Sequence, residues 1–262
     1  MTLGRAMIWA AASAVLLFLF IPILLVVAYA FDASTIQSWP IKAFTLHWFA
    51  DTWADQEVRG ALVLSIEVAL VATGLAAVLG TLAALAVRRH AFFGRDVLSF
   101  ALVLPIALPG VLTGMALNAY FAVLGWDLSF WTIVVGHATF CIVIVYNNAI
   151  ARLRRLPDSL DEASADLGAG PWRTFRRVTW PMLASALGAG ALLAFALSFD
   201  EVIVTTFTAG AQTTLPLWIF GAIRLGQRLP EVNVVVAAVL ALTVVPVALA
   251  QRLMGEAGGL HR

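Results

Sequence analysis

Residues 152–181 read RLRRLPDSLDEASADLGAGPWRTFRRVTWP and form the one long polar stretch between two very apolar ones. The stretch carries six of the sixteen basic residues and four of the fifteen acidic ones. Asp158 or Ser159 can cap a short helix whose first turn holds acids, where the helix dipole favours negative charge. Gly168 or Gly170 can end that helix. A structured polar loop in so apolar a chain predicts a docking surface for a soluble partner.

Apolar residues make up 62% of the chain and charged residues 12%, whereas globular domains average roughly 45–50% and about 25%. Runs of about 20 apolar residues indicate membrane-spanning helices. We therefore predict an all-α integral membrane protein with six transmembrane helices, forming a single domain over residues 1–262. The six expected spans cover residues 7–30, 61–87, 97–124, 131–151, 182–204 and 233–251.

The first expected span has an alternative interpretation as a secretory signal. Arg5 gives it a charged start, and Ala28, Tyr29 and Ala30 resemble a small-residue cleavage site. However, the uncharged run from Ala6 onward is longer than the apolar core of such a signal and is long enough to span. We expect the segment to be kept as a span.

The basic residues predict the orientation, because cytoplasmic loops of membrane proteins carry an excess of Lys and Arg. Six spans put both termini on one side, and twelve of the sixteen basic residues then fall on that side. We therefore expect both termini and the 152–181 loop to be cytoplasmic. Loops 31–60, 125–130 and 205–232 are expected to face outward. A soluble multi-helix core would not sort arginine in this way.

Pro105, Pro109, Gly110 and Gly114 interrupt the third expected span. Proline removes a backbone donor and clashes with the preceding turn. Such breaks survive in a membrane only where protein or a watery cavity satisfies the freed carbonyls. The third span is therefore expected to be bent and to line a cavity. The alternative is a simple kink packed against neighbouring helices.

Three carboxylates and one amide are candidates for a translocation path. At about 1.5 Å per residue, Glu67 lies roughly 9 Å inside its span, and Asp200 and Glu201 lie roughly 27–29 Å from the cytoplasmic start of theirs. All three acids then fall in the outer half of the membrane, and Asn118 lies at the outer end of the third span. Intramembrane acids usually face an interior path or a partner, and carboxylates would suit a cationic substrate. Alternatively, Asp200 and Glu201 lie at the water boundary and Glu67 bonds a neighbouring helix.

Catalytic and metal-binding motifs are absent from the sequence. Lys42 is the only lysine and has no GxxxxGK[ST] context, the histidines show no HExxH spacing, and Cys141 stands alone. The basic residues fall in separate loops and give no indication of nucleic acid. We expect no catalytic residue, no metal site and no bound cofactor on this chain. Any energised work would then need a nucleotide site on another chain.

The segment EASADLGA at residues 162–169, followed by Trp180 and Pro181, resembles the EAA loop of ABC-importer permeases. The family form is EAAxxLGA, a spacer and a hydrophobic-proline pair. Ser164 stands where the second alanine usually is, and serine is small enough to preserve docking. Within the superfamily, the chain most resembles the spermidine/putrescine-type permeases. This further resemblance lies in residues 130–140, 197–202, 215–217 and 230–233.

The resemblance implies a type I ABC importer permease fold in the bacterial inner membrane. A coupling helix would insert into a dimer of cytoplasmic ATP-binding cassette ATPase subunits, which would bind ATP and Mg, so this chain is not expected to be an enzyme. A second permease subunit, expected to be a different chain, would complete the path. A periplasmic or surface-tethered binding protein would deliver the solute. The coupling helix would consist of Glu162, Ala163, Ser164, Asp166, Leu167 and Gly168.

Polyamines such as spermidine and putrescine are the solutes that the resemblance indicates. Relatives for ferric iron, phosphonates and other small solutes share the architecture and are the first alternative. A secondary transporter or channel is a second alternative, although it would place more ionisable residues at the membrane midplane and need no docking loop. A non-transporting membrane scaffold is the third.

Overall fold

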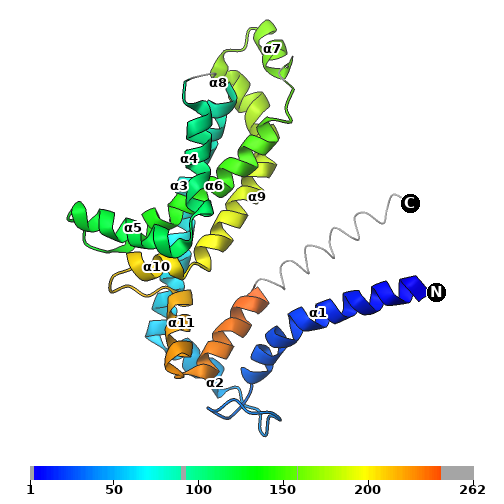
Figure 1. Ribbon diagram of the computed structural model, residues 1–262, viewed down its shortest axis with the longest axis vertical. Helices are drawn as coiled ribbons and strands as arrows, with labels where there is room; N and C mark the ends of the chain where they lie inside the picture. The colour runs from blue at the N-terminus through cyan, green and yellow to red at the C-terminus, as the bar shows by residue number, and fades with distance from the viewer. Residues whose placement is uncertain (1–2, 90–92, 158, 243–262) are drawn as a thin grey trace. The chain divides into compact units, whose positions relative to one another are not determined.

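The computed structural model describes residues 3–89, 93–157 and 159–242, which are helical apart from connecting loops and one isolated bridge between Asp32 and Phe44. The all-α prediction is therefore confirmed. A last helix is described over Leu229–Leu242. In chain order, the preceding elements are α1 (Leu3–Tyr29), α2 (His47–Ala54), α3 (Gln56–Arg89), α4 (Arg95–Ala107), α5 (Gly110–Val123), α6 (Phe130–Leu153), α7 (Ser159–Asp166), α8 (Pro171–Thr174), the π-helical turn η1 (Phe175–Thr179), α9 (Trp180–Phe199), α10 (Ile203–Thr208) and α11 (Leu215–Leu225) (Figure 1).

The chain divides into two compact units. The larger unit runs from Gly60 to Trp218 and contains α4 to α10. The smaller unit combines the residues up to Arg59 with those from Ile219 onward, and it contains α1 and α2. The boundary between the units lies within α3 and within α11. The single permease domain over residues 1–262 stays a prediction.

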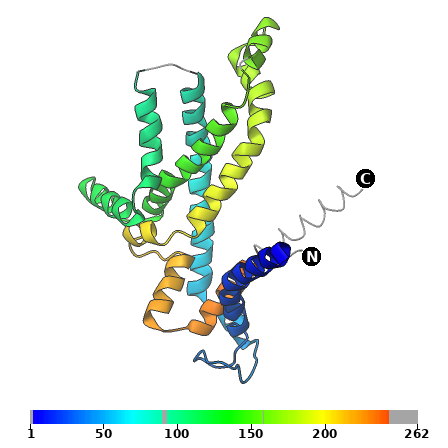
Figure 2. The same ribbon diagram turned by 45° about the vertical axis from the view of Figure 1, so that its right-hand side comes forward.

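The core of the larger unit lies between α3, α6 and α9. Figures 1 and 2 show α6 and α9 side by side. Small residues let α3 approach α6 closely, since a Cβ on Gly80 would lie 2.9 Å from the carbonyl oxygen of Ile142. The buried side chains of this cluster include Ala76, Ala84, Cys141, Val145, Tyr146, Ala149, Leu183, Leu187 and Ala194.

Four helical stretches are long and apolar enough to cross a membrane, and they correspond to the first, second, fourth and fifth expected spans. A broken pair of helices would supply one more span, and its halves are bent by 109°. The bend falls at Leu108 and Pro109, whose ψ values of 143° and 132° are extended rather than helical. The bend expected in the third span is thereby confirmed. The four stretches are Met7–Tyr29, Gln56–Arg88, Phe130–Leu153 and Pro171–Phe199.

The last two expected spans differ from their predicted bounds. The sequence predicts the fifth over residues 182–204, but α9 ends at Phe199 and α10 begins at Ile203. After the break, the Glu201 carboxylate accepts a hydrogen bond from the Val204 N–H at 2.8 Å and so stabilises the first turn of α10. The sixth, over residues 233–251, is helical as far as residue 242, and its remainder lies outside the described residues.

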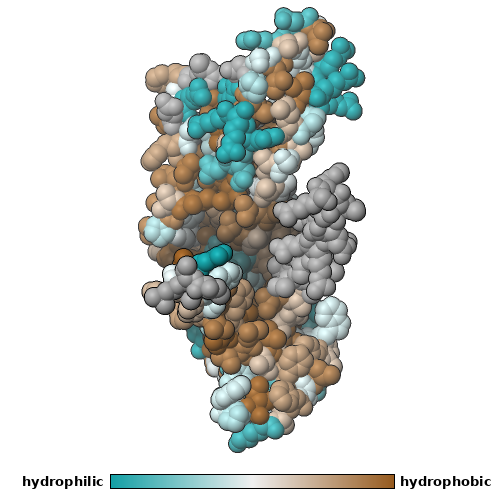
Figure 3. All heavy atoms as spheres, turned by 90° about the vertical axis from the view of Figure 1, so that its right-hand side faces the viewer, coloured by the Kyte–Doolittle hydropathy of each residue, from teal (hydrophilic) through white to brown (hydrophobic). Residues whose placement is uncertain are grey.

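The surface of the larger unit agrees with a membrane environment. Hydrophilic residues gather at the end that carries α7 and α8, and hydrophobic residues cover the helices next to it (Figure 3). Large apolar side chains are exposed along several helices, among them Leu70 on α3, Leu112 on α5 and Leu192 on α9. Water would oppose so much exposed apolar surface, whereas lipid accepts it.

Two glycines of α3 form a matched pair for testing the packing of α3 on α6. Gly80→Ala should lower the midpoint of thermal unfolding, because its Cβ would meet α6 backbone at 2.9 Å, and overpacking costs about 1–3 kcal/mol. Gly74→Ala should leave the midpoint unchanged or raise it, since nothing lies within 4 Å of that Cβ and alanine favours helix by about 1 kcal/mol. Circular dichroism in detergent measures both midpoints. Equal midpoints would contradict this packing.

Candidate functional site

The polar loop between α6 and α9 contains the short helix α7, as the sequence predicts, followed by α8 and η1. The helix ends in a Schellman cap, in which the Gly168 N–H donates to Ala165 O at 2.8 Å and the Ala169 N–H donates to Ser164 O at 3.0 Å. Gly168 has a φ of +72°, a left-handed conformation that glycine adopts without steric cost. The predicted helix end at Gly168 is thereby confirmed.

One surface of α7 and its cap is open to solvent. Leu167 is 88% exposed. The other predicted docking residues Glu162, Ala163, Asp166 and Gly168 are exposed as well. A protruding leucine beside acidic and small residues can be buried by a partner with little rearrangement of this chain. The structure therefore presents five of the six predicted docking residues for contact.

Ser164, the sixth residue of the predicted set, is half-buried and forms a hydrogen bond within the loop. Its hydroxyl lies 2.8 Å from the hydroxyl of Thr174, which is buried in α8. This contact joins α7 to α8 and so to the start of α9. The departure from the usual alanine thus introduces a hydrogen bond that an alanine could not make.

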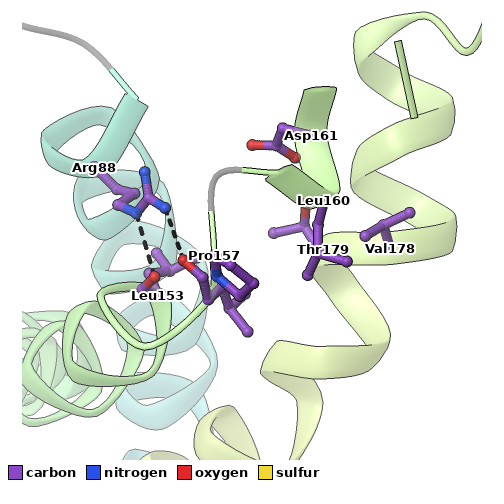
Figure 4. Close-up of a pocket in the computed structure, with 8 residues that line it drawn as sticks. Arg88, Leu153, Pro157, Leu160, Asp161, Val178 and Thr179 are labelled. Carbon is purple, nitrogen blue, oxygen red and sulfur yellow. Dashed lines mark hydrogen bonds between the residues drawn. The ribbon is translucent and has the colours of Figure 1, made fainter. Parts of the chain in front are cut away.

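A small pocket lies at the base of the loop (Figure 4). Leu160 from α7 and Val178 from η1 line it together with residues at the end of α6. Arg88 of α3 donates from Nε to Leu153 O at 3.2 Å and from Nη2 to Leu156 O at 3.1 Å (Figure 4). The last carbonyls of a helix have no partner within it. Arg88 therefore stabilises the end of α6 from which the loop departs.

A second arginine joins the two helices that flank the loop. Arg152, in the last turn of α6, donates from Nε to Met182 O in α9 at 2.9 Å. The charge pattern of the sequence assigned Arg88 and Arg152 to one side of the membrane but did not assign these contacts. Their position in the last turn of a helix did not reveal these contacts, because both arginines bond carbonyls outside their own helix.

The four candidate path residues fall into two groups. Glu67 is exposed on α3 and Asp200 is exposed at the end of α9, and in the described part of the chain neither side chain has a hydrogen bond or an ion pair. Asn118 donates from Nδ2 to Phe207 O at 2.7 Å and so joins α5 to α10. The half-buried Glu201 accepts a hydrogen bond from the Val204 N–H in the first turn of α10. Two candidates therefore have exposed carboxylates, and two bond to the backbone of α10.

The bend between α4 and α5 borders an apolar hollow of about 370 Å³. Pro105 and Leu108 line it from the bend, Thr113 and Tyr120 from α5, and Thr139 from α6. The interrupted third span thus borders a hollow, whereas a watery cavity that satisfies the freed carbonyls stays a prediction. This hollow has no charged lining residue, so the acidic candidates lie elsewhere on the unit.

An ion cluster ties two predicted outward loops together within the smaller unit. Arg228 donates from Nη1 to Glu57 at 2.9 Å and from Nε to Glu231 at 2.8 Å, and it also pairs with Asp55. The hydrogen bonds that Arg228 donates to the carboxylates of Glu231 and Asp55 raise the pKa of its guanidinium. Burial raises the pKa of the Asp55 carboxyl, but hydrogen bonds from the Glu57 N–H and from Arg228 outweigh it and hold that pKa below its ordinary value.

Comparison with solved structures defines the class of protein. The fold matches a bacterial ABC transporter involved in the import of the acidic polysaccharide alginate with a TM-score of 0.68, covering 98% of both chains at 15% identity. At that identity the likeness concerns the fold alone. The chain therefore has the type I permease fold of ABC importers.

Sequence comparison gives the family. Residues 76–255 match the family described as binding-protein-dependent transport system inner membrane component, and the chain belongs to it. The putrescine transport system permease protein PotI of Escherichia coli (strain K12) is 36% identical over 85% of this chain and 82% of its own length. The spermidine/putrescine transport system permease protein PotC of Haemophilus influenzae is 32% identical over 89% and 91%, respectively.

Asp55→Asn should remove an acid-sensitive contribution to stability. Because folding lowers the pKa of Asp55, its contribution is present above the ordinary value of 3.8 and is lost as pH falls through the lower folded-state value. The variant should therefore unfold at a lower temperature than the wild type at neutral pH, and the two midpoints should converge as pH falls below 3.8. Asp51→Asn, at an exposed acid of α2, is the control and should match the wild type. A gap that persists in acid would contradict the assigned ion pair.

Proposed function

We propose that this chain is the permease subunit of an ATP-driven, binding-protein-dependent importer whose solutes are polyamines. The observation that carries the proposal is the exposed, glycine-capped α7 between α6 and α9. A protein that moved solute without an energy-supplying partner would have no use for such a docking helix. Membership of an inner-membrane transport family supports the same conclusion.

The partner at α7 is a dimer of cytoplasmic ATP-binding cassette ATPase subunits, which holds ATP and Mg, while this chain performs no catalysis. Leu167 is the apolar contact, and Glu162 and Asp166 flank it. Arg88, Arg152 and the Ser164–Thr174 pair support the helix from below. A push on α7 therefore reaches α6 and α9 through defined hydrogen bonds rather than through a loose linker.

The remaining partners follow from the orientation. Both termini and α7 lie in the cytoplasm, and loops 31–60 and 205–232 face outward, where a solute-binding protein delivers its cargo. A second permease subunit, a different chain, faces this one across the path. The concentration of arginine at the α7 end of the molecule supports this orientation.

The cationic solute is supported by two independent features. The relatives PotI and PotC are named for putrescine and for spermidine/putrescine transport. Glu67 and Asp200 expose carboxylates on helices that the family places in the membrane, and an ammonium group is their natural counter-charge. A permease for ferric iron or a phosphonate is the alternative that a solute screen distinguishes.

Gly168→Val should reduce coupled uptake severalfold while the protein still inserts in the membrane. Valine is strained at φ +72°, which costs roughly 1–2 kcal/mol and would distort the α7 cap. Gly170→Val is the matched control, because Gly170 has a φ of −71° and, like Gly168, nothing lies within 4 Å of its Cβ. Uptake and ATPase stimulation in proteoliposomes containing the whole importer measure the effect. Equal activity of the two variants would contradict the docking assignment.

Asp200→Asn should lower the rate of polyamine uptake severalfold, because it removes an exposed negative charge from the proposed path. Assembly with the ATPase should persist. Glu67→Gln is a second test of the same idea, scored only if its expression is normal. If neither path variant changed uptake, the acidic path would be wrong and a neutral or anionic solute would be favoured.

A further inference from the structure

A buried histidine lies where α6 meets α9 and α10. His137 is 1% exposed, about 10 Å along α6 from its first residue at a rise of about 1.5 Å per residue. Its Nδ1 lies 2.8 Å from the Ser198 hydroxyl, and its Nε2 lies 2.9 Å from the Thr205 hydroxyl. Both hydroxyls are buried too. Each polar edge of the imidazole ring thus has one partner, and the partners come from two different helices.

Counting hydrogens assigns the tautomer of the ring. The Thr205 hydroxyl has a single hydrogen, and it donates this hydrogen to Glu201 O at 2.7 Å. Thr205 can therefore only accept from His137, so Nε2 carries the proton. The ring bonds two neutral hydroxyls and no carboxylate, and a buried charge would lack compensation. His137 is therefore neutral, and its Nδ1 accepts from Ser198.

The two partners lie on opposite sides of the break between α9 and α10. Ser198 lies in the last turn of α9, and Thr205 lies within α10. The ring therefore connects the two helices across the break that contains Asp200 and Glu201. The same surface of α6 packs tightly on α10 nearby, since a Cβ on Gly136 would lie 3.0 Å from a methyl group of Val204. A core residue that only filled space would not need a partner on each side of the break.

We propose that His137 is a positioning residue that fixes the angle between α9 and α10 and thereby the direction in which Asp200 and Glu201 are presented. It acts through Ser198 and Thr205 and does not itself touch solute. The bridging role is independent of the solute. Its consequence for transport rests on the proposed function, in which Asp200 lies on the path.

Two threonines of α10 make a matched test. Thr205 and Thr208 are both fully buried, and each hydroxyl donates to the carbonyl four residues earlier, at 2.7 Å and 3.0 Å. Only the Thr205 hydroxyl also accepts from His137. Replacing either by valine keeps the shape and removes one hydroxyl, so a difference between Thr205→Val and Thr208→Val isolates the bond to His137.

The readout for position is a cysteine in place of Asp200, in the fully assembled importer. The native Cys141 is buried, and importer without the added cysteine gives the baseline for an impermeant thiol reagent. Thr205→Val, Ser198→Ala and His137→Leu should each change the labelling rate at least threefold, whereas Thr208→Val should stay within twofold. Unchanged labelling in the folded Thr205→Val and Ser198→Ala variants would overturn the proposal, even if His137→Leu failed to fold.

A second readout separates the bridge from the path. With Asp200 intact, Thr205→Val should lower kcat for uptake severalfold. The KM for the loaded binding protein should not change, because the His137–Thr205 bond affects the passage of solute and not the docking of the binding protein. Altered labelling with normal uptake would support the positioning role of His137 and contradict the placement of Asp200 on the transport path. Nitrogen NMR of labelled histidine, with His137→Leu to assign the signal, should show a neutral ring protonated at Nε2. A ring protonated at Nδ1 or at both nitrogens would also overturn the proposal.

Discussion

Freed backbone carbonyls must find hydrogen-bond donors wherever a helix breaks in apolar surroundings, and this constraint governs the larger unit. Side-chain donors lie near several of the breaks. Asn118 bonds the carbonyl of Phe207 where α5 meets α10, and Arg88 and Arg152 bond carbonyls at the loop. The Thr205 hydroxyl donates to the carbonyl of Glu201 and accepts a hydrogen bond from His137.

The helices α6 and α9 connect α7 to the α9–α10 break within the larger unit. At one end they carry α7, which is joined to them through Arg152 and through Ser164 with Thr174. At the other end, the α9–α10 break presents Asp200. A helix of 20 residues spans about 30 Å, so α9 alone links the docking surface to the exposed acid. Their close packing, in which a Cβ on Gly190 would lie 3.2 Å from Asn148, makes the pair a stiff connection.

Much of the fold, and the position and cap of α7, could be predicted from the sequence. Apolar runs predicted the spanning helices, prolines predicted the bend at Pro109, and the acid-rich start and Gly168 predicted α7. The end of α9 could not be predicted, because neither glycine nor proline marks the break at Asp200. The half-buried position of Ser164 and the backbone bond of Asn118 were also missed, since their partners are brought close only by the folding of the loop and by the packing of α5 on α10.

The sequence by itself determined the class of environment and the local elements, because hydrophobic length, charge asymmetry and cap residues act over a few neighbours. Only the tertiary structure decided which polar side chains are exposed and which are used internally. His137, Asn118 and Asp200 are all polar residues in or beside apolar segments, and composition treats them alike. His137 and Asn118 form hydrogen bonds between helices, whereas Asp200 is exposed. The difference arises because the packing of the helices decides which side chains lie within hydrogen-bond distance of a partner.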